Sequence, residues 1–425
     1  MPTAPMHRTP RRCLSICLLL ICAVSTMSHA QTAAQWNSRG ADAYEAGNWA
    51  DAAEAFQKAY ELDRRDNTIQ HNLVNAVVMY AQDLNASGNQ EDAIEWLEYV
   101  ISVDPENVPP LNQLGAYLLF QGNIASAIFR LEESIEIDPN DIDAHFLLGE
   151  AYYKDNDVTS AIDQWEWVYQ LDPEYGGLQQ RLKNALREEK VEFDFHGDSS
   201  RNFHVTYSQE AEGNLVREVL DILESAYRSI GKSLGGIYPP TPIQVSLYTS
   251  EGFIASTALG QHVGALYDGT KIRCPVLDKN GKSIPLDVLR ERLFHEYVHV
   301  VVRHIAGNNV PWWFNEGLAE TLSTQVSPIE KQILKEAYAN RQLYGFDTIT
   351  PQDLLSAFSP EDLELAYAQS HVAVIYLQQR YGTRRLTRML QSLKAGFEGE
   401  DALRDALGVS YFTLKSQVRS AIAKD

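Results

Sequence analysis

Residues Leu286–Ala306 read LDVLRERLFHEYVHVVVRHIA, and this stretch decides how the second half of the chain folds. It contains no glycine or proline, follows Pro285 and stops at Gly307, which predicts one long helix with a defined start and end. Within it, His295 and His299 are four residues apart. Positions i and i+4 lie on the same face of a helix, so both imidazoles can reach one metal ion.

A second helix is expected to begin near Pro311, in the stretch PWWFNEGLAE. On it, Glu316 can supply a third metal ligand, and Glu320 faces the same way and can accept the second ring N–H of a ligand histidine. Three protein ligands with one open position are typical of a catalytic zinc, whereas structural zinc sites are closed by four. The pattern predicts one Zn²⁺ per chain. The alternative is that the aromatic residues are core and the glutamates form a solvated face.

The strings HEYVHVVV and PWWFNEGLAE resemble the gluzincin branch of the peptidase MA-like zinc metallopeptidases, whose distant relatives include thermolysin and the aminopeptidase-N enzymes. The resemblance runs roughly from Asn202 to the C-terminus and is sharp over Leu293–Glu320. It implies an α+β, thermolysin-like domain in which Glu296 is the catalytic general base. It also implies three zinc ligands: His295, His299 and Glu316.

The sequence departs from the aminopeptidase-N enzymes in one motif. Those enzymes keep a G-A-M-E-N strand whose acid holds the free amine of the substrate. The nearest string here, GALYD, has Tyr267 in the acid's place. A dedicated aminopeptidase is therefore unsupported, and an endopeptidase is slightly favoured.

A hairpin is expected just before the metal-binding helix. The dipeptide Asp268-Gly269 favours a two-residue turn between strands at Val263–Tyr267 and Thr270–Val276. The edge of such a hairpin can pair with an extended peptide substrate through backbone hydrogen bonds. An ordinary sheet edge is the alternative.

A further helix, Glu361–Gln379, carries candidates for a second catalytic role. Tyr367 and His371 lie on the same face, and either can donate a hydrogen bond to the oxyanion that forms during peptide hydrolysis. A packing contact of these side chains against a neighbouring helix is the alternative, and the sequence does not decide between them.

The N-terminus indicates where the protein works. Three arginines precede the apolar run Cys13–Val24, and Ser28-His29-Ala30 offers small residues where a signal peptidase cleaves. We expect a signal peptide over residues 1–30, cleaved near Ala30, and therefore a periplasmic or secreted protein. The apolar run is too short for a transmembrane anchor, because a span needs about 20 apolar residues. Cys274 is the one cysteine outside this segment, so a disulfide framework is excluded. The net charge of −21 argues against nucleic acid as a partner.

The first half of the chain is repetitive. Asp-Pro pairs recur every 34 residues at Asp104, Asp138 and Asp172, which is the tetratricopeptide period. Alanines recur in step with them: Ala52, Ala93, Ala127 and Ala161. The first interval between these alanines, from Ala52 to Ala93, is seven residues longer than the others. The extra residues predict a longer helix between Asp63 and Gly88. The pattern resembles about four tetratricopeptide repeats, whose concave face binds a protein partner or an extended peptide.

These observations predict a multidomain chain. A signal peptide (1–30) precedes an all-α tetratricopeptide superhelix (31–176), a capping helix and linker (177–200), and an α+β gluzincin metallopeptidase domain (201–425). The predicted function is zinc-dependent hydrolysis of peptide bonds in the cell envelope or outside the cell, with the repeats recruiting substrate or partner. The alternative is a non-catalytic repeat scaffold or envelope assembly factor with a degenerate peptidase domain. Retention of Glu296 beside the predicted ligands favours the enzyme.

Overall fold

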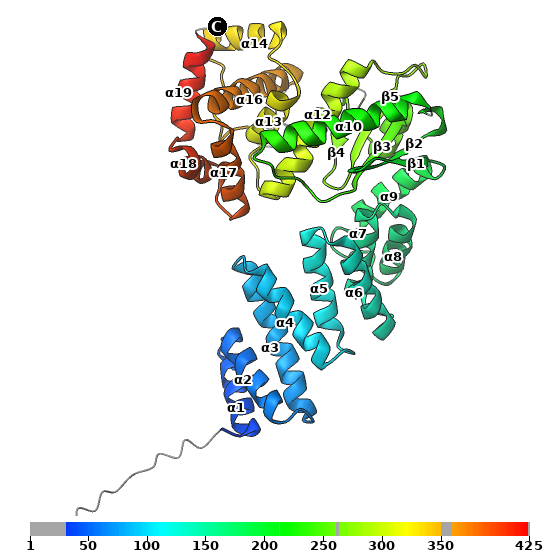
Figure 1. The fold of residues 1–425 in the computed structure, drawn as a ribbon, viewed down its shortest axis with the longest axis vertical. Coiled ribbons are helices and arrows are strands. Elements are labelled where there is room, and N and C mark those ends of the chain that lie inside the picture. Colours follow the sequence, from blue (N-terminus) through cyan, green and yellow to red (C-terminus); the bar gives the residue numbers. More distant parts are fainter. Residues whose placement is uncertain (1–30, 212, 261–262, 350–358, 424–425) are drawn as a thin grey trace, which may run out of the picture. The chain divides into compact units, whose positions relative to one another are not determined.

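The computed structural model describes residues 31–211, 213–260, 263–349 and 359–423 (Figure 1). The expected signal peptide and its cleavage point at Ala30 lie outside the described residues. The chain divides into two compact units, Met1–Tyr80 and Ala81–Asp425.

The first unit contains the helix pair α1 (Ala33–Glu45) and α2 (Trp49–Leu62), and α3 (Asn67–Ala86) begins in it. Gly40 of α1 faces Phe56 of α2 so closely that a Cβ on the glycine would lie 2.7 Å from the ring. The pair can therefore approach this closely only with a glycine at that position. With 20 residues, α3 is longer than α2, which has 14, so the prediction of a longer helix here is confirmed.

The second unit begins with repeat helices and a capping helix: α4 (Gln90–Val103), α5 (Val108–Gln121), α6 (Ile124–Ile137), α7 (Ile142–Lys154), α8 (Val158–Leu171) and α9 (Leu178–Glu192). The recurring alanines of the sequence pattern are all fully buried: Ala52, Ala93, Ala127 and Ala161. Close helix pairing again depends on a glycine, because a Cβ on Gly149 would lie 2.4 Å from Trp165. Small residues at fixed positions thus let each helix pack onto its partner.

A five-stranded mixed sheet follows: β1 (His196–Ser199), β2 (Phe203–Tyr207), β3 (Ile243–Thr249), β4 (Leu266–Tyr267) and β5 (Ile272–Leu277). The strand order is β1-β2-β3-β5-β4. The three central strands are parallel, and the two edge strands, β1 and β4, pair antiparallel with their neighbours. The strand β4 therefore forms one edge of the sheet.

The two faces of the sheet differ in chemistry. Side chains alternate along a strand, so Val245 and Leu247 of β3 face one side and Ser246 and Tyr248 the other. The apolar side is covered by α10 (Asn214–Ser233) and by α12 (Leu286–Ala306), whose bounds are those predicted from the sequence (Figure 1). The polar side meets α9 and α11 (Ser250–Thr257).

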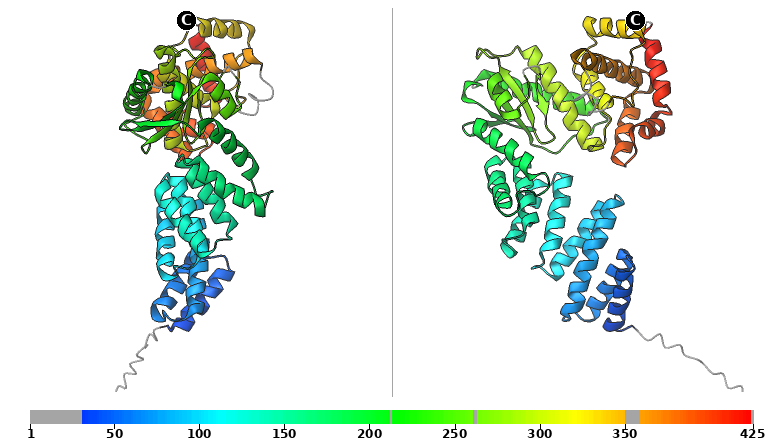
Figure 2. Two further views of the ribbon diagram at one scale, coloured as in Figure 1. Left: turned by 90° about the vertical axis from the view of Figure 1, so that its right-hand side faces the viewer. Right: turned by 180° about the vertical axis from the view of Figure 1, so that it is seen from behind.

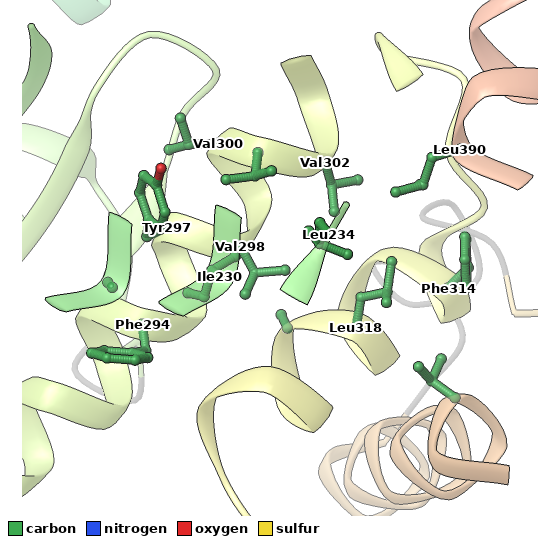
Figure 3. Close-up of a cluster of buried hydrophobic side chains, with 14 of the residues drawn as sticks. Ile230, Leu234, Phe294, Tyr297, Val298, Val300, Val302, Phe314, Leu318 and Leu390 are labelled. Atoms are coloured by element: carbon green, nitrogen blue, oxygen red, sulfur yellow. The ribbon is translucent and has the colours of Figure 1, made fainter. Parts of the chain in front are cut away.

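The remaining helices complete the same hydrophobic core: α13 (Trp312–Ser323), α14 (Pro328–Asn340), α16 (Pro360–Tyr381), α17 (Thr383–Lys394), α18 (Gly399–Leu407) and α19 (Tyr411–Ile422). Figure 2 shows the C-terminal helices, coloured orange to red, beside the sheet. One cluster of buried side chains has members from Phe203 of β2 to Ile422 of α19. In Figure 3, Val298 of α12 lies near Ile230 of α10 and Leu318 of α13. No helix among the described residues is long and apolar enough to cross a membrane.

Two sequence expectations about strands were wrong. The strand β1 was not expected, because its four residues are all exposed and show no apolar alternation; pairing with β2 makes it a strand. The hairpin turn has four residues rather than two, since Tyr267 pairs with Ile272. The Asp268 carboxylate accepts hydrogen bonds from the amides of Thr270 (2.8 Å) and Lys271 (2.9 Å), which holds the wider turn.

Candidate metal centre

The helices α12 and α13 bring the three predicted metal ligands together. His295 Nε2 lies 3.4 Å from Glu316 Oε2, and His299 Nε2 lies 3.6 Å from the same oxygen. All three ligand atoms are within 4.8 Å of one another, so one ion can contact all of them. The two histidines come from successive turns of α12, and Glu316 comes from the second turn of α13.

The donor set fits a tetrahedral metal such as zinc. Zinc bonds of about 2.0–2.1 Å to nitrogen and oxygen place neighbouring ligand atoms about 3.4 Å apart in a tetrahedron. The two distances between imidazole nitrogen and carboxylate oxygen lie close to that value. Glu316 and the neighbouring Glu296 are 9% and 7% exposed. Two carboxylates this deeply buried need positive charge beside them.

The electrostatics favour a cation at the same point. Burial by itself lowers the pKa of His295, but the hydrogen bond to Glu316 and the negative charges of Glu296 and Glu320 outweigh it and raise the pKa to about 9. Burial raises the pKa of Glu296. The negative field that favours a proton on His295 also favours a divalent ion between the ligands.

The second nitrogen of each ligand histidine has a partner. Glu320, predicted to accept the second ring N–H of a ligand histidine, lies with its Oε1 3.5 Å from His295 Nδ1. His299 Nδ1 lies 3.0 Å from Asn315 Oδ1. Such partners fix the tautomer and leave Nε2 free for a metal. Asn315 was not predicted from the sequence; its place directly before Glu316 is the signal that identifies it.

The predicted general base is held by the edge strand. Glu296 Oε2 accepts a hydrogen bond of 2.6 Å from the backbone N–H of Tyr267 in β4. The residue that departs from the aminopeptidase-N pattern therefore touches Glu296 through its backbone. The Tyr267 amide thus holds Oε2 of the carboxylate in place, and this hydrogen bond does not engage the other oxygen, Oε1.

A cavity of about 420 Å³ opens beside the three predicted metal ligands. Its wall includes Leu266 and Tyr267 of β4, Arg303 of α12 and Tyr367 of α16. A larger cavity, about 700 Å³, lies between the end of α10 and the start of α17. Its lining includes none of the three predicted ligands, which form the one group among the described residues whose ligand atoms are placed so that they could hold a metal ion. The smaller cavity is therefore the candidate active site.

The structure separates the two candidate oxyanion donors. Tyr367 lines the cavity, and its ring packs edge-on against Trp312 with centroids 4.9 Å apart. Burial, together with the nearby glutamates, raises the pKa of Tyr367, so its hydroxyl stays protonated and can donate. His371 does not line the cavity: its ring is fully buried, with Nδ1 2.9 Å from Glu330 Oε1.

Gly317 lets α16 approach α13 closely. A Cβ at this position would lie 2.4 Å from the backbone oxygen of Ser370 and 2.6 Å from Val374. Gly317→Ala is expected to lower the free energy of unfolding by about 1–3 kcal/mol, the usual cost of overpacking a core. Chemical denaturation measures the change.

The matched control is Gly176→Ala, because no atom lies within 4 Å of a Cβ at that glycine. It is expected to leave the free energy of unfolding nearly unchanged. Equal stability of both variants and the unaltered protein would show that α13 and α16 do not approach each other as described.

Comparisons with known proteins agree with this architecture. Residues 282–424 match the model of the Peptidase MA superfamily, and residues 118–156 match that of a TPR repeat. A comparison with curated proteins gave no match.

Two solved MamA structures, a mutant and one described as MSR-1, share 20% identity with this chain at a TM-score of 0.30. Each match covers 37% of this chain and 88% or 87% of the other. At this score the likeness carries no conclusion about the chain. The two family matches support a conclusion: this protein carries tetratricopeptide repeats ahead of a domain of the peptidase MA superfamily.

Proposed function

We propose that this protein is a zinc-dependent peptidase that hydrolyses peptide bonds of peptides or proteins. The observation that carries the proposal is the convergence of His295, His299 and Glu316 on one point, beside a cavity that Glu296 also lines. Two neutral nitrogens, one carboxylate and an adjacent second carboxylate form the donor set and base of a metal-assisted hydrolase. The match to the Peptidase MA superfamily supports the reaction class.

The residues have distinct tasks in this mechanism. When bound, zinc supplies Lewis acidity, which makes water more acidic and polarises the scissile carbonyl. Glu296 takes the proton of the attacking water on its free oxygen Oε1 and passes it to the departing amine. The Tyr267 amide holds the other carboxylate oxygen throughout, so that Glu296 stays oriented.

The cavity suits an extended peptide. The segment that ends in the edge strand β4 contributes Val263, Ala265, Leu266 and Tyr267 to the cavity wall. A peptide that pairs with this edge passes directly by Glu296. Because no acid stands at Tyr267 to hold a free amine, cleavage within a chain is favoured over removal of its first residue.

Tyr367→Phe is expected to lower kcat about 10²- to 10³-fold, the usual cost of losing one oxyanion donor, while zinc content stays unchanged. The change removes only the hydroxyl and keeps the ring that packs on Trp312. Steady-state hydrolysis of a fluorogenic peptide measures the effect. Tyr376→Phe, on the same helix outside the cavity lining, is the matched control and is expected to retain activity. A fully active Tyr367→Phe variant would remove this residue from the mechanism.

The repeats are proposed to bind a protein partner or to deliver substrate, since stacked tetratricopeptide helices form peptide-binding surfaces. The arginine-flanked apolar run before Ala30 supports a location in the cell envelope or outside the cell.

Metal analysis of the purified protein tests the proposed function. We expect about one zinc per chain and hydrolysis of an unfolded protein such as casein that stops with a chelator and returns with added zinc. A metal-free protein that hydrolyses nothing after zinc is added would contradict the proposal and favour the scaffold.

A further inference from the structure

A cluster of charged side chains joins the last repeat to the active-site hairpin. It consists of Glu188 and Glu192 of α9, Asp268 and Lys271 at the two ends of the turn, and Arg273 of β5, and is called the charged cluster below. Lys271 and Arg273 are two residues apart, so both project from the polar face of the sheet.

The centre of the charged cluster is closed to solvent, whereas Asp268 at its edge is exposed. Lys271 is 2% exposed, Arg273 is 4% exposed and Glu188 is 1% exposed. Lys271 forms an ion pair with Glu188, and its Nζ lies 3.1 Å from Glu192 Oε2. Removing several charges from water usually costs about as much as their attraction returns, so such a cluster is weak evidence for stability. Its fixed geometry is the more informative property.

Two residues of the last repeat (α7 and α8), Tyr153 and Asn156, form hydrogen bonds with the charged cluster. Tyr153, at the end of α7, donates a hydrogen bond of 2.7 Å to Glu188 and accepts one of 2.9 Å from Arg273. Asn156, in the loop after α7, accepts a hydrogen bond of 2.8 Å from Lys271. The contacts to Lys271 and Arg273 join residues more than 100 positions apart in the chain.

Hydrogen bonds and the hairpin backbone connect the charged cluster to Glu296, the predicted general base. Arg273 Nε donates a hydrogen bond of 2.7 Å to Asp268 Oδ2, and Asp268 Oδ1 holds the hairpin turn through two backbone amides. The residue before Asp268 is Tyr267, whose amide donates to Glu296. An unbroken series of hydrogen bonds and one peptide link therefore runs from the last repeat to Glu296.

We propose that the last repeat positions the catalytic centre: through the charged cluster it fixes the hairpin whose Tyr267 amide holds Glu296. Tyr153 and Asn156 are positioning residues that touch neither substrate nor metal. The inference rests on the proposed peptidase function for its effect on rate, but its effect on the hairpin is independent of that function.

Tyr153→Phe tests the proposal, because it removes one hydroxyl from the charged cluster and keeps the ring. The matched control is Tyr152→Phe, the adjacent residue of α7, whose hydroxyl bonds instead to Glu132 of the repeats at 2.7 Å. Hydrogen exchange of the Tyr267 amide is expected to quicken roughly tenfold in Tyr153→Phe and to stay within about twofold in the control.

Kinetics give the second readout. We expect kcat of Tyr153→Phe to fall about tenfold, since small misplacements of a catalytic group are costly, with KM and zinc content unchanged within about twofold. Asn156→Gly, which keeps the left-handed backbone (φ 67°) and removes the acceptor for Lys271, is expected to act in the same direction. It also serves if Tyr153→Phe does not fold.

Equal exchange at Tyr267 in Tyr153→Phe and Tyr152→Phe would overturn the proposal, as would a uniform rise in exchange over the whole sheet. If the unaltered protein hydrolyses no peptide but Tyr153→Phe still loosens the hairpin, the positioning inference stands and the proposed peptidase function fails.

Discussion

Glu296→Gln is expected to keep the bound zinc and to lower kcat for peptide hydrolysis by about 10²- to 10⁴-fold, the range that a general acid–base group contributes. Glutamine keeps the side-chain length and still offers an oxygen to the Tyr267 amide, which donates to the carboxylate at 2.6 Å. It cannot take a proton from water at physiological pH. The predicted ligand atoms belong to other residues, so the metal remains. Single-turnover rates, with zinc content measured on the same sample, report both properties.

The matched control is Glu291→Gln, which makes the same change on an exposed residue of the same helix. It is expected to retain both zinc and activity. Full activity of Glu296→Gln would refute the assignment of the base, and loss of its zinc would mean that Glu296 supports the metal and not only the proton transfer.

His299→Ala is expected to lose the metal and with it all turnover. The substitution removes one of three ligand side chains and also leaves the Asn315 amide oxygen, 3.0 Å from Nδ1, without its partner. Loss of an outer-shell partner alone costs about 10- to 100-fold in metal affinity, and loss of a direct ligand is expected to exceed that. Competition with a zinc-binding dye measures the dissociation constant.

His304→Ala is the control for this variant, because His304 is on the same helix but does not belong to the metal-binding group. We expect unchanged zinc affinity. If His299→Ala bound zinc as tightly as the unaltered protein, the ion would be held by other residues.

The parts of this molecule that the sequence predicted depend on local patterns. The bounds of α12 follow from Pro285, directly before its first residue, and Gly307, directly after its last, and both signals are local. The spacing of His295 and His299 fixes their common face for the same reason. The buried alanines of the repeats follow from intervals of 41, 34 and 34 residues, which two further helical turns in the first interval bring into step.

The parts that it missed depend on contacts between distant segments. Nothing near Tyr267 in the sequence indicates that its amide bonds to Glu296, 29 residues away. Lys271 and Arg273 read as ordinary charged positions of a hairpin, yet both are buried against α9. Local spacing put Tyr367 and His371 on one face of a helix, but only the packing of α13 and α14 decides that Tyr367 lines the cavity while His371 pairs with Glu330.

The most direct test of the central claim is anomalous X-ray scattering at the zinc edge from crystals of the protein grown with zinc. We expect one strong peak within bonding distance of His295 Nε2, His299 Nε2 and the Glu316 carboxylate. A peak bound to other residues, or no peak between these three side chains, would contradict it.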